Sequence, residues 1–104
     1  MTRPDPPPLE VYRTTPVFDA TTIPAGLLRR HTTKAGVWAR LHVLEGELVF
    51  RRLEPVVSET ILRPEACDVL VGPQEPHEIE ARGPVRFFIE FLRRSGDDPP
   101  DSER

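Results

Sequence analysis

Residues 37–43 read VWARLHV, and this stretch decides the fold class. Apolar side chains stand at every second position, with aromatic or charged side chains between them. A period of two is that of a β-strand, whereas a helix repeats every 3.6 residues. The stretch therefore predicts a strand whose inner face carries Val37, Ala39, Leu41 and Val43, and whose outer face carries Trp38, Arg40 and His42.

Further strand-like runs lie on the C-terminal side of this stretch. Residues 48–50 read LVF and follow Gly46, which permits a positive φ and predicts a tight turn at residues 45–47. Glycine and proline separate the later apolar runs, and no amphipathic helical window exceeds about two turns. The sequence predicts an all-β fold, a sandwich or small barrel, with further strands at residues 60–62, 69–71, 77–80 and 85–92.

The length of 104 residues predicts one domain, over residues 9–94. Residues 1–8 and 95–104 are rich in proline, serine and acidic side chains and are expected to be disordered tails. The net charge is −3, and the last ten residues account for all of it. The segment 9–94 carries twelve acidic and twelve basic side chains, so it lacks the basic excess that nucleic-acid binding requires.

Cellular location is suggested by two features of the composition. The single cysteine, Cys67, can form no internal disulfide, which favours a reducing cytoplasm. No run approaches the ~18 apolar residues of a membrane span, and the first residues lack the apolar stretch of a signal peptide. We expect a cytoplasmic protein with no membrane partner.

Three side chains form a candidate metal site. His77 follows the stiff segment GPQEP at residues 72–76, which would deliver its imidazole to a defined place. His31 lies among basic residues, which favour the neutral imidazole that can ligate a metal. Glu90 lies within an apolar run, where a carboxylate is costly to bury unless it is paired or binds a cation.

Each of these residues also has a plainer interpretation. His77 and His31 can be surface residues in a turn and at a strand end, and Glu90 can reach solvent or pair with Arg40 or Arg86. If all three converge, two histidines and a carboxylate match a facial-triad iron site or a catalytic zinc site. The spacing leaves the metal open among zinc, iron, nickel and manganese.

Several segments resemble a known family. They are YRTTPVF at 12–18, PAGLL at 24–28, HTTKAGVW at 31–38 and FIEF at 88–91. They resemble the small cupin-like domains named after the tellurite-resistance protein TehB. VLEGEL at 43–48 and VGPQEPH at 71–77 also look like the two half-motifs of the cupin superfamily.

This resemblance implies a double-stranded β-helix, a jelly-roll barrel open at one end, with a divalent metal held by histidines and a carboxylate. In cupins the second motif would carry His77 into the site. The first motif departs from the cupin pattern, because Ala39 stands where a glutamate is usual and only His31 lies near the histidine region. Glu90 then completes a different ligand set, or no tight metal site exists.

The resemblance implies a metal-binding protein of tellurite, oxyanion or stress tolerance, with or without metal-centred chemistry. Its link with tellurite comes from longer proteins that add a methyltransferase, and this chain lacks a glycine-rich nucleotide-binding segment. Methyl transfer is therefore not expected of this polypeptide alone.

The alternative is a non-catalytic module that binds a small molecule or oxyanion and acts as a homodimer. Arg40 and Trp38, on the outer face of the first strand, are the predicted ligand-binding residues, because an arginine fork suits oxyanions. Whether the protein is an enzyme stays open between the two hypotheses.

Overall fold

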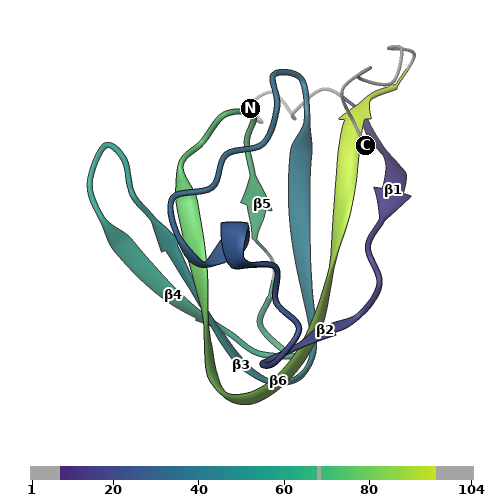
Figure 1. Ribbon diagram of the computed structural model, residues 1–104. Helices are drawn as coiled ribbons and strands as arrows, with labels where there is room; N and C mark the ends of the chain where they lie inside the picture. Colours follow the sequence, from purple (N-terminus) through teal and green to yellow (C-terminus); the bar gives the residue numbers. More distant parts are fainter. Residues whose placement is uncertain (1–7, 68, 96–104) are drawn as a thin grey trace, which may run out of the picture.

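Six strands and one short 3-10 helix make up the computed structural model, which describes residues 8–67 and 69–95 (Figure 1). The predicted all-β fold is confirmed. The elements are β1 (Leu9–Thr14), β2 (Phe18–Asp19), η1 (Ala25–Leu28), β3 (Trp38–Arg52), β4 (Ser58–Leu62), β5 (Leu70–Val71) and β6 (His77–Arg94).

Strands β3 and β6 form one long antiparallel ribbon. Their register runs from Trp38 opposite Leu92 to Arg52 opposite His77. The pairing is irregular around Gly46, and there the ribbon bends, at the bottom of Figure 1. Gly46 has a φ of +79°, and a Cβ at this position would overlap the carbonyl oxygen of Pro84.

The tight turn predicted at residues 45–47 is only half right. The positive φ of Gly46 is present, but the chain does not reverse there. A bulged strand and a turn both use a left-handed glycine, so the residue type could not separate them. In the same way, the two runs at 77–80 and 85–92 are one strand, because β6 continues through Gly83 and Pro84.

The core lies inside the bend, between the two halves of the ribbon. The predicted inner stripe of residues 37–43 is confirmed, since its four apolar side chains are 1–5% exposed. Three of them, Ala39, Leu41 and Val43, pack with buried side chains from the second half of β3, from β6, from β4 and from β5. These include Leu48, Phe50, Leu62, Val71, Ile79, Val85, Phe87 and Ile89.

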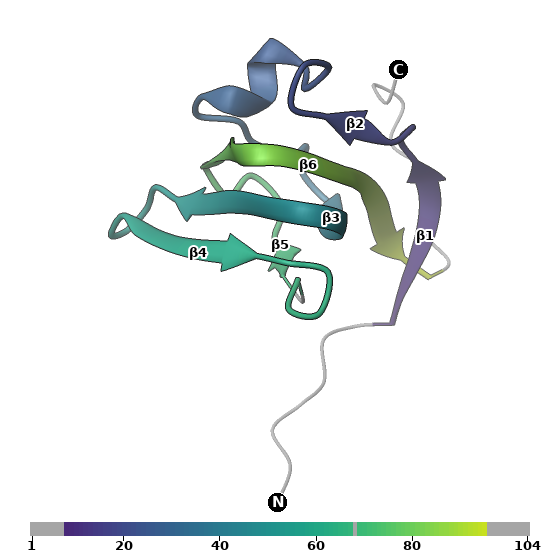
Figure 2. The ribbon, with the colours of Figure 1, turned by 90° about the horizontal axis from the view of Figure 1, so that it is seen from below.

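The sheet is not closed into a barrel. Its order is β1-β6-β3-β4, with β2 added to β6 and β5 added to β3. Strands β1 and β4 are therefore its two edges, and Figure 2 shows them on opposite sides of the curled sheet. The jelly-roll barrel expected from the resemblance is thus replaced by an open, strongly bent sheet.

Residues 18–28, which run from β2 through η1, cover part of the inner face (Figures 1 and 2). Three side chains of this segment are half-buried and pack against the core, namely Phe18, Ile23 and Leu27. No residue of η1 is fully buried, so the short helix is a lid on the sheet and not part of its centre.

Most of the two expected tails lies outside the described residues. Of these tails the structure describes only Pro8 and Ser95, and the Ser95 backbone N–H donates a hydrogen bond of 2.9 Å to the Pro8 carbonyl. Within residues 8–67 and 69–95, no helix has the length and apolar character needed to cross a membrane.

Candidate functional site

The structure brings His31 and His77 together. Their backbones form an isolated β-bridge, in which the His31 N–H donates to the His77 carbonyl at 2.6 Å and the His77 N–H donates to the His31 carbonyl at 2.9 Å. The two rings meet edge to face, with 5.3 Å between their centroids and 82° between their planes. This bridge fastens the segment that follows η1 to the beginning of β6.

The surroundings of both imidazoles favour the neutral form. Burial lowers the pKa of His77, which is 6% exposed, even though the carbonyl of Glu75 accepts a hydrogen bond of 2.8 Å from its Nδ1. Burial also lowers the pKa of His31, and the neighbouring His77 lowers it further. The Nδ1 atom of His31 is buried and has no hydrogen-bond partner among the described residues.

A cavity of about 260 Å³ lies beside this pair, under η1. Among the described residues of its wall, Arg13 is the one charged side chain, and the Arg13 guanidinium lies 5.8 Å from the centroid of the Phe91 ring. The Thr15 hydroxyl donates to the Pro16 carbonyl and accepts from the Ile89 N–H, at 2.9 and 3.0 Å. The rest of the wall is mainly apolar, with Phe18, Pro24, Gly26, Leu27, His31, Ile89 and Phe91.

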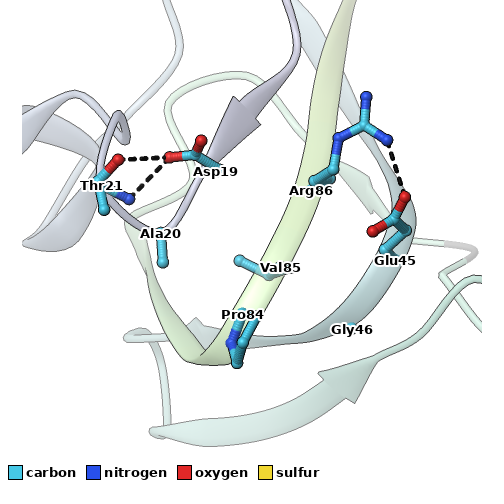
Figure 3. A pocket seen from close by; sticks show the side chains of 8 residues that line it. All are labelled: Asp19, Ala20, Thr21, Glu45, Gly46, Pro84, Val85 and Arg86. Atoms are coloured by element: carbon cyan, nitrogen blue, oxygen red, sulfur yellow. Dashed lines mark hydrogen bonds and ion pairs between the residues drawn. The ribbon is translucent and has the colours of Figure 1, made fainter.

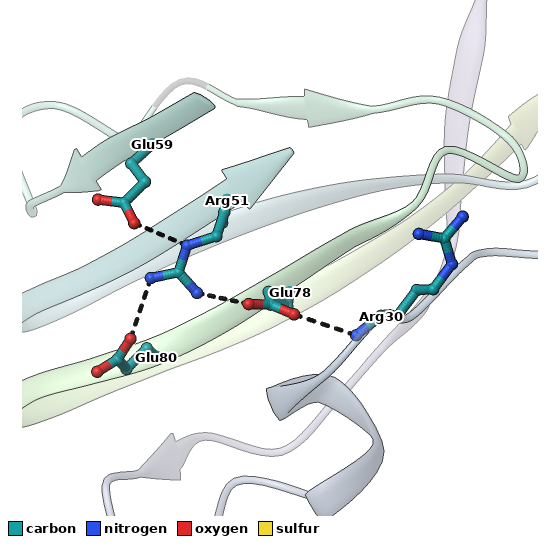
Figure 4. Close-up of polar contacts among 5 residues, drawn as sticks. All are labelled: Arg30, Arg51, Glu59, Glu78 and Glu80. Atoms are coloured by element: carbon teal, nitrogen blue, oxygen red, sulfur yellow. Dashed lines mark hydrogen bonds and ion pairs between the residues drawn. The ribbon is translucent and has the colours of Figure 1, made fainter. Parts of the chain in front are cut away.

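An ion-pair network on the outer face supports the histidine bridge (Figure 4). The Arg51 guanidinium donates to Glu59, Glu78 and Glu80 at 2.7, 2.5 and 3.1 Å, and these bonds raise its pKa. Glu78 also accepts a hydrogen bond of 3.3 Å from the backbone N–H of Arg30. Because Arg30 precedes His31 and Glu78 follows His77, the network holds both sides of the bridge.

Glu90 does not join the two histidines. It lies on the outer face of the ribbon, where its Oε1 is 2.7 Å from the Nε2 of His42. The His42 ring in turn stacks on Phe88, with 4.7 Å between ring centroids. The plainer interpretation of Glu90 as a paired carboxylate is therefore correct, but its partner is His42 and not Arg40 or Arg86.

Arg40 and Trp38 also lie away from the cavity under η1. Arg40 stands opposite Glu90 in the register of β3 and β6, and Trp38 stands opposite Leu92. Neither residue lines the cavity. Their part in ligand binding stays a prediction.

A second hollow, of about 720 Å³, lies at the bend of the ribbon (Figure 3). Its polar groups bond to one another. Arg86 donates to Glu45 at 2.8 Å, while Asp19 accepts from the backbone N–H and the hydroxyl of Thr21 at 2.8 and 2.7 Å. These bonds leave few polar groups of the hollow to be satisfied by a ligand.

Sequence reasoning missed the cationic side of the cavity. Arg13 and Thr15 lie in residues 12–18, where the sequence indicates a family resemblance but no site residue. The alternation of charged and apolar residues in β1 was a usable signal, because LEVYRT at 9–14 reads as an edge strand. Its pairing with β6 places Arg13 opposite Phe91.

Comparison with known proteins identifies relatives. A family model described as the TehB-like domain matches residues 13–89. Two Haemophilus influenzae proteins, from strains Rd and 10810, are each described as "Probable S-adenosyl-L-methionine-dependent methyltransferase TehB". Each is 37% identical over 73 residues, which is 67% of this chain and 26% of the relative. The chain thus spans about a quarter of the length of these curated relatives.

Solved structures agree with this relationship. The crystal structure of TehB from Haemophilus influenzae matches with a TM-score of 0.79 and 32% identity, covering 84% of this chain and 32% of that one. A protein from E. coli (strain K12) matches with a TM-score of 0.76 and 24% identity, covering 89% and 98%. Hydroxypropylphosphonic acid epoxidase from S. wedmorenis matches with 0.54 and 22%, covering 74% and 40%. The last two show likeness of fold alone.

These findings overturn the functional expectation. A metal-binding cupin of oxyanion tolerance, and its alternative as a non-catalytic binding module, are both wrong, because the relatives are named as methyltransferases that depend on S-adenosyl-L-methionine. The wider placement among cupins finds no support in these comparisons.

The expectation of a divalent metal as cofactor is wrong for the same reason, because the relatives are named as dependent on S-adenosyl-L-methionine. In addition, no group of three or more His, Cys, Asp or Glu side chains in residues 8–67 and 69–95 is placed to hold a metal ion. The expected homodimer and the expected small-molecule partner stay predictions.

The family itself is settled by two independent comparisons. The TehB-like model covers well over half of the 104 residues, and the same region superimposes on the crystal structure of TehB. The chain therefore belongs to the TehB-like domain family.

Proposed function

We propose that this chain acts in S-adenosyl-L-methionine-dependent methyl transfer, as a β domain that works beside a separate catalytic domain. The observation that carries the proposal is the 37% identity over 73 residues with proteins named as methyltransferases of this type. The activity named for the whole relative comes to this chain only through this proposal, because the match spans 26% of that protein.

The division of labour follows from what the described residues can hold. Nucleoside cofactors commonly bind where a parallel strand ends in a glycine-rich turn that leads into a helix. Here each strand pairing within residues 8–67 and 69–95 is antiparallel, and the helical element is four residues long. S-adenosylmethionine therefore does not fit this part of the chain, and the proposal places the cofactor on the separate catalytic domain.

The proposal is tested by exchanging domains with the Haemophilus influenzae relative. Three proteins are compared: intact TehB, TehB without the matched segment, and TehB in which residues 13–89 of this chain replace that segment. Each is given S-adenosylmethionine and a small-molecule extract of bacterial cells, and formation of S-adenosylhomocysteine is measured. We expect turnover with intact TehB and with the exchanged protein, and loss of most turnover after deletion. If the deleted protein is as active as intact TehB, the domain has no part in methyl transfer.

A further inference from the structure

The two ends of the described domain lie at one corner of the sheet. The Ser95 N–H donates to the Pro8 carbonyl at 2.9 Å, so β1 begins where β6 ends (Figure 1). The match with the TehB crystal structure covers 32% of that chain, so most of TehB is attached through one or both ends of the matched domain. A second domain that is joined at either end therefore begins near this corner.

The outer face of the sheet beside this corner is mainly apolar. Side chains at opposite positions of paired strands lie on the same face of a sheet. Trp38 is on the outer face, so Leu92, which is opposite it in β6, and Val11, which is opposite Leu92 in β1, lie there too. The next outer position of β3 is Arg40, with Leu70 opposite it in β5. We call these five residues the corner face.

Part of the corner face is open to solvent. Val11 is 44% exposed, and Trp38, Arg40 and Leu70 are half-buried. Arg40 has no ion-pair partner among residues 8–67 and 69–95. Tryptophan and arginine are enriched at the centres of protein–protein interfaces, where a few such residues supply most of the binding energy.

The outer face of the other half of the ribbon has a different composition. There Arg51 bonds to Glu59, Glu78 and Glu80, and the side chains of Glu59 and Glu80 are 55% and 63% exposed (Figure 4). A partner that covered this network would have to remove these charges from water, which is costly. The corner face is therefore the part of the outer surface that a partner can cover at the lower cost.

We propose that the corner face is the surface on which the catalytic methyltransferase domain docks, so that the two domains form one unit. The proposed function supplies the partner, and the inference rests on it. Two independent observations support the place of docking, namely the meeting of the chain ends and the composition of the face. Leu92 lies three residues before Ser95, which is about 10 Å of extended strand, so an attached domain needs no long linker to reach it.

Hydroxyl-radical footprinting tests whether the corner face is covered, because side chains are oxidised more slowly where solvent is excluded. It is applied to the full chain alone and to the TehB in which residues 13–89 of this chain replace the matched segment, both without S-adenosylmethionine. We expect Trp38 to be oxidised at least about threefold more slowly in the exchanged TehB. Val56 and Val57, which are 74% and 60% exposed between β3 and β4, are the internal controls and should be oxidised equally in both proteins.

Other occupants of the corner face give different results. An oxidation rate of Trp38 in the full chain that rises on dilution would assign the face to a second copy of this chain. A rate that rises when residues 1–7 or 96–104 are deleted would assign it to that terminal segment. Either result overturns the proposal, and so do equal rates for Trp38 in the full chain and in the exchanged TehB.

A charge reversal tests whether the contact is specific. In the exchanged TehB, Arg40→Glu should raise the oxidation rate of Trp38 at least about threefold, because a reversed charge disfavours docking on the same partner surface. Arg63→Glu is the matched control, since Arg63 lies outside the corner face and bonds to Glu47 at 2.7 Å, and it should leave this rate unchanged. Neither variant should change the rate in the full chain alone. A rate in the exchanged TehB that is insensitive to Arg40→Glu contradicts the proposal.

The two proposals fail in different ways. If Trp38 is covered but the exchanged TehB forms no S-adenosylhomocysteine, docking at the corner face stands and the role in methyl transfer falls. If the exchanged TehB is active but Trp38 is oxidised as fast as in the full chain, the role in methyl transfer stands and docking at the corner face falls.

Discussion

The cavity under η1 and the hollow at the bend of the ribbon differ in whether their polar groups have hydrogen-bond partners. At the bend, Glu45 and Arg86 bond to each other, and Asp19 is satisfied by Thr21 (Figure 3). Under η1, a buried imidazole nitrogen of His31 lacks a partner among the described residues. The hollow at the bend has almost three times the volume, at about 720 against 260 Å³.

The contrast teaches that volume is a poor guide to a binding site in this fold. The hollow at the bend forms where the ribbon curves around Gly46, and its charged side chains already have partners within it. The smaller cavity has a mainly apolar wall, and beside it a buried imidazole nitrogen has no partner among the described residues. The following predictions test how differently the two regions contribute to stability.

Substitution at the bend should have the largest effect. Gly46→Ala places a Cβ against the Pro84 carbonyl at a positive φ, and we expect a loss of about 3 kcal/mol in the free energy of unfolding. Chemical denaturation measures this loss. The control is Gly26→Ala in η1, where a Cβ meets no atom within 4 Å, and its stability should change by less than about 0.5 kcal/mol. Equal losses in the free energy of unfolding for the two variants would contradict a special role of Gly46 at the bend.

Truncation of the lid should have a moderate effect. Leu27 is half-buried and packs against the core from η1, so Leu27→Ala should cost about 1 kcal/mol of stability. Thermal unfolding measures this loss. A change in stability below about 0.3 kcal/mol would show that η1 adds little to the core.

Acid should weaken the histidine bridge by a smaller amount. Burial lowers the folded-state pKa of both His31 and His77 below the unfolded value of about 6.5. The unfolded chain therefore binds more protons as the pH falls below about 6.5, and stability is lost from there down to the folded pKa values. The urea midpoint should fall between pH 7.5 and 5.5, and His31→Gln should make this fall shallower.

A half-buried carboxylate near this bridge, Glu75, acts in a different pH range. The pKa of Glu75 is lowered, despite burial, by its hydrogen bonds to Gly72 and Arg52. Its contribution to stability is present above about pH 4.5 and is lost only as the pH falls further. A urea midpoint that is constant between pH 7.5 and 5.5 would contradict the assignment to the histidines.

Removal of a charge at the bend should have the smallest effect. Arg86 and Glu45 form an ion pair whose side chains are 50% and 64% exposed. Such pairs contribute little, so Arg86→Gln should change stability by less than about 0.5 kcal/mol. Denaturation at low and at high salt measures the difference. A loss above about 1 kcal/mol would mean that the bend relies on charge as well as on shape.

The inner stripe of β3 was predictable because alternation depends only on the backbone period. The same rule fails after Gly46, where the inner positions change from odd numbers, such as Leu41, to even numbers, such as Leu48. A bulge causes this change, and its effect on register is decided by the partner strand, which local sequence does not contain. For the same reason, the sequence alone does not show that the chain continues through Gly46 as one strand instead of reversing there.

The outward direction of Glu90 could be predicted from the sequence, because alternation places it on the face opposite Phe87 and Ile89. In β6 the fully buried side chains up to residue 89 have odd numbers, as in His77, Ile79, Phe87 and Ile89. Its partner His42 could not be predicted in this way, because the pairing depends on the register between β3 and β6. The meeting of His31 with His77 is different, because it depends on a bridge between distant segments that no periodicity encodes.

The route of β3 and β6 through both halves of the bent sheet has a consequence for how the molecule opens. Each strand contributes side chains from both sides of Gly46 to one core, so neither half can detach without exposing apolar side chains of the other. Fluctuations that expose amide protons near Leu48 or Phe87 should therefore require nearly global unfolding, whereas the segment around η1 can exchange by local opening. A rigid frame and a yielding lid can thus coexist in a chain this short.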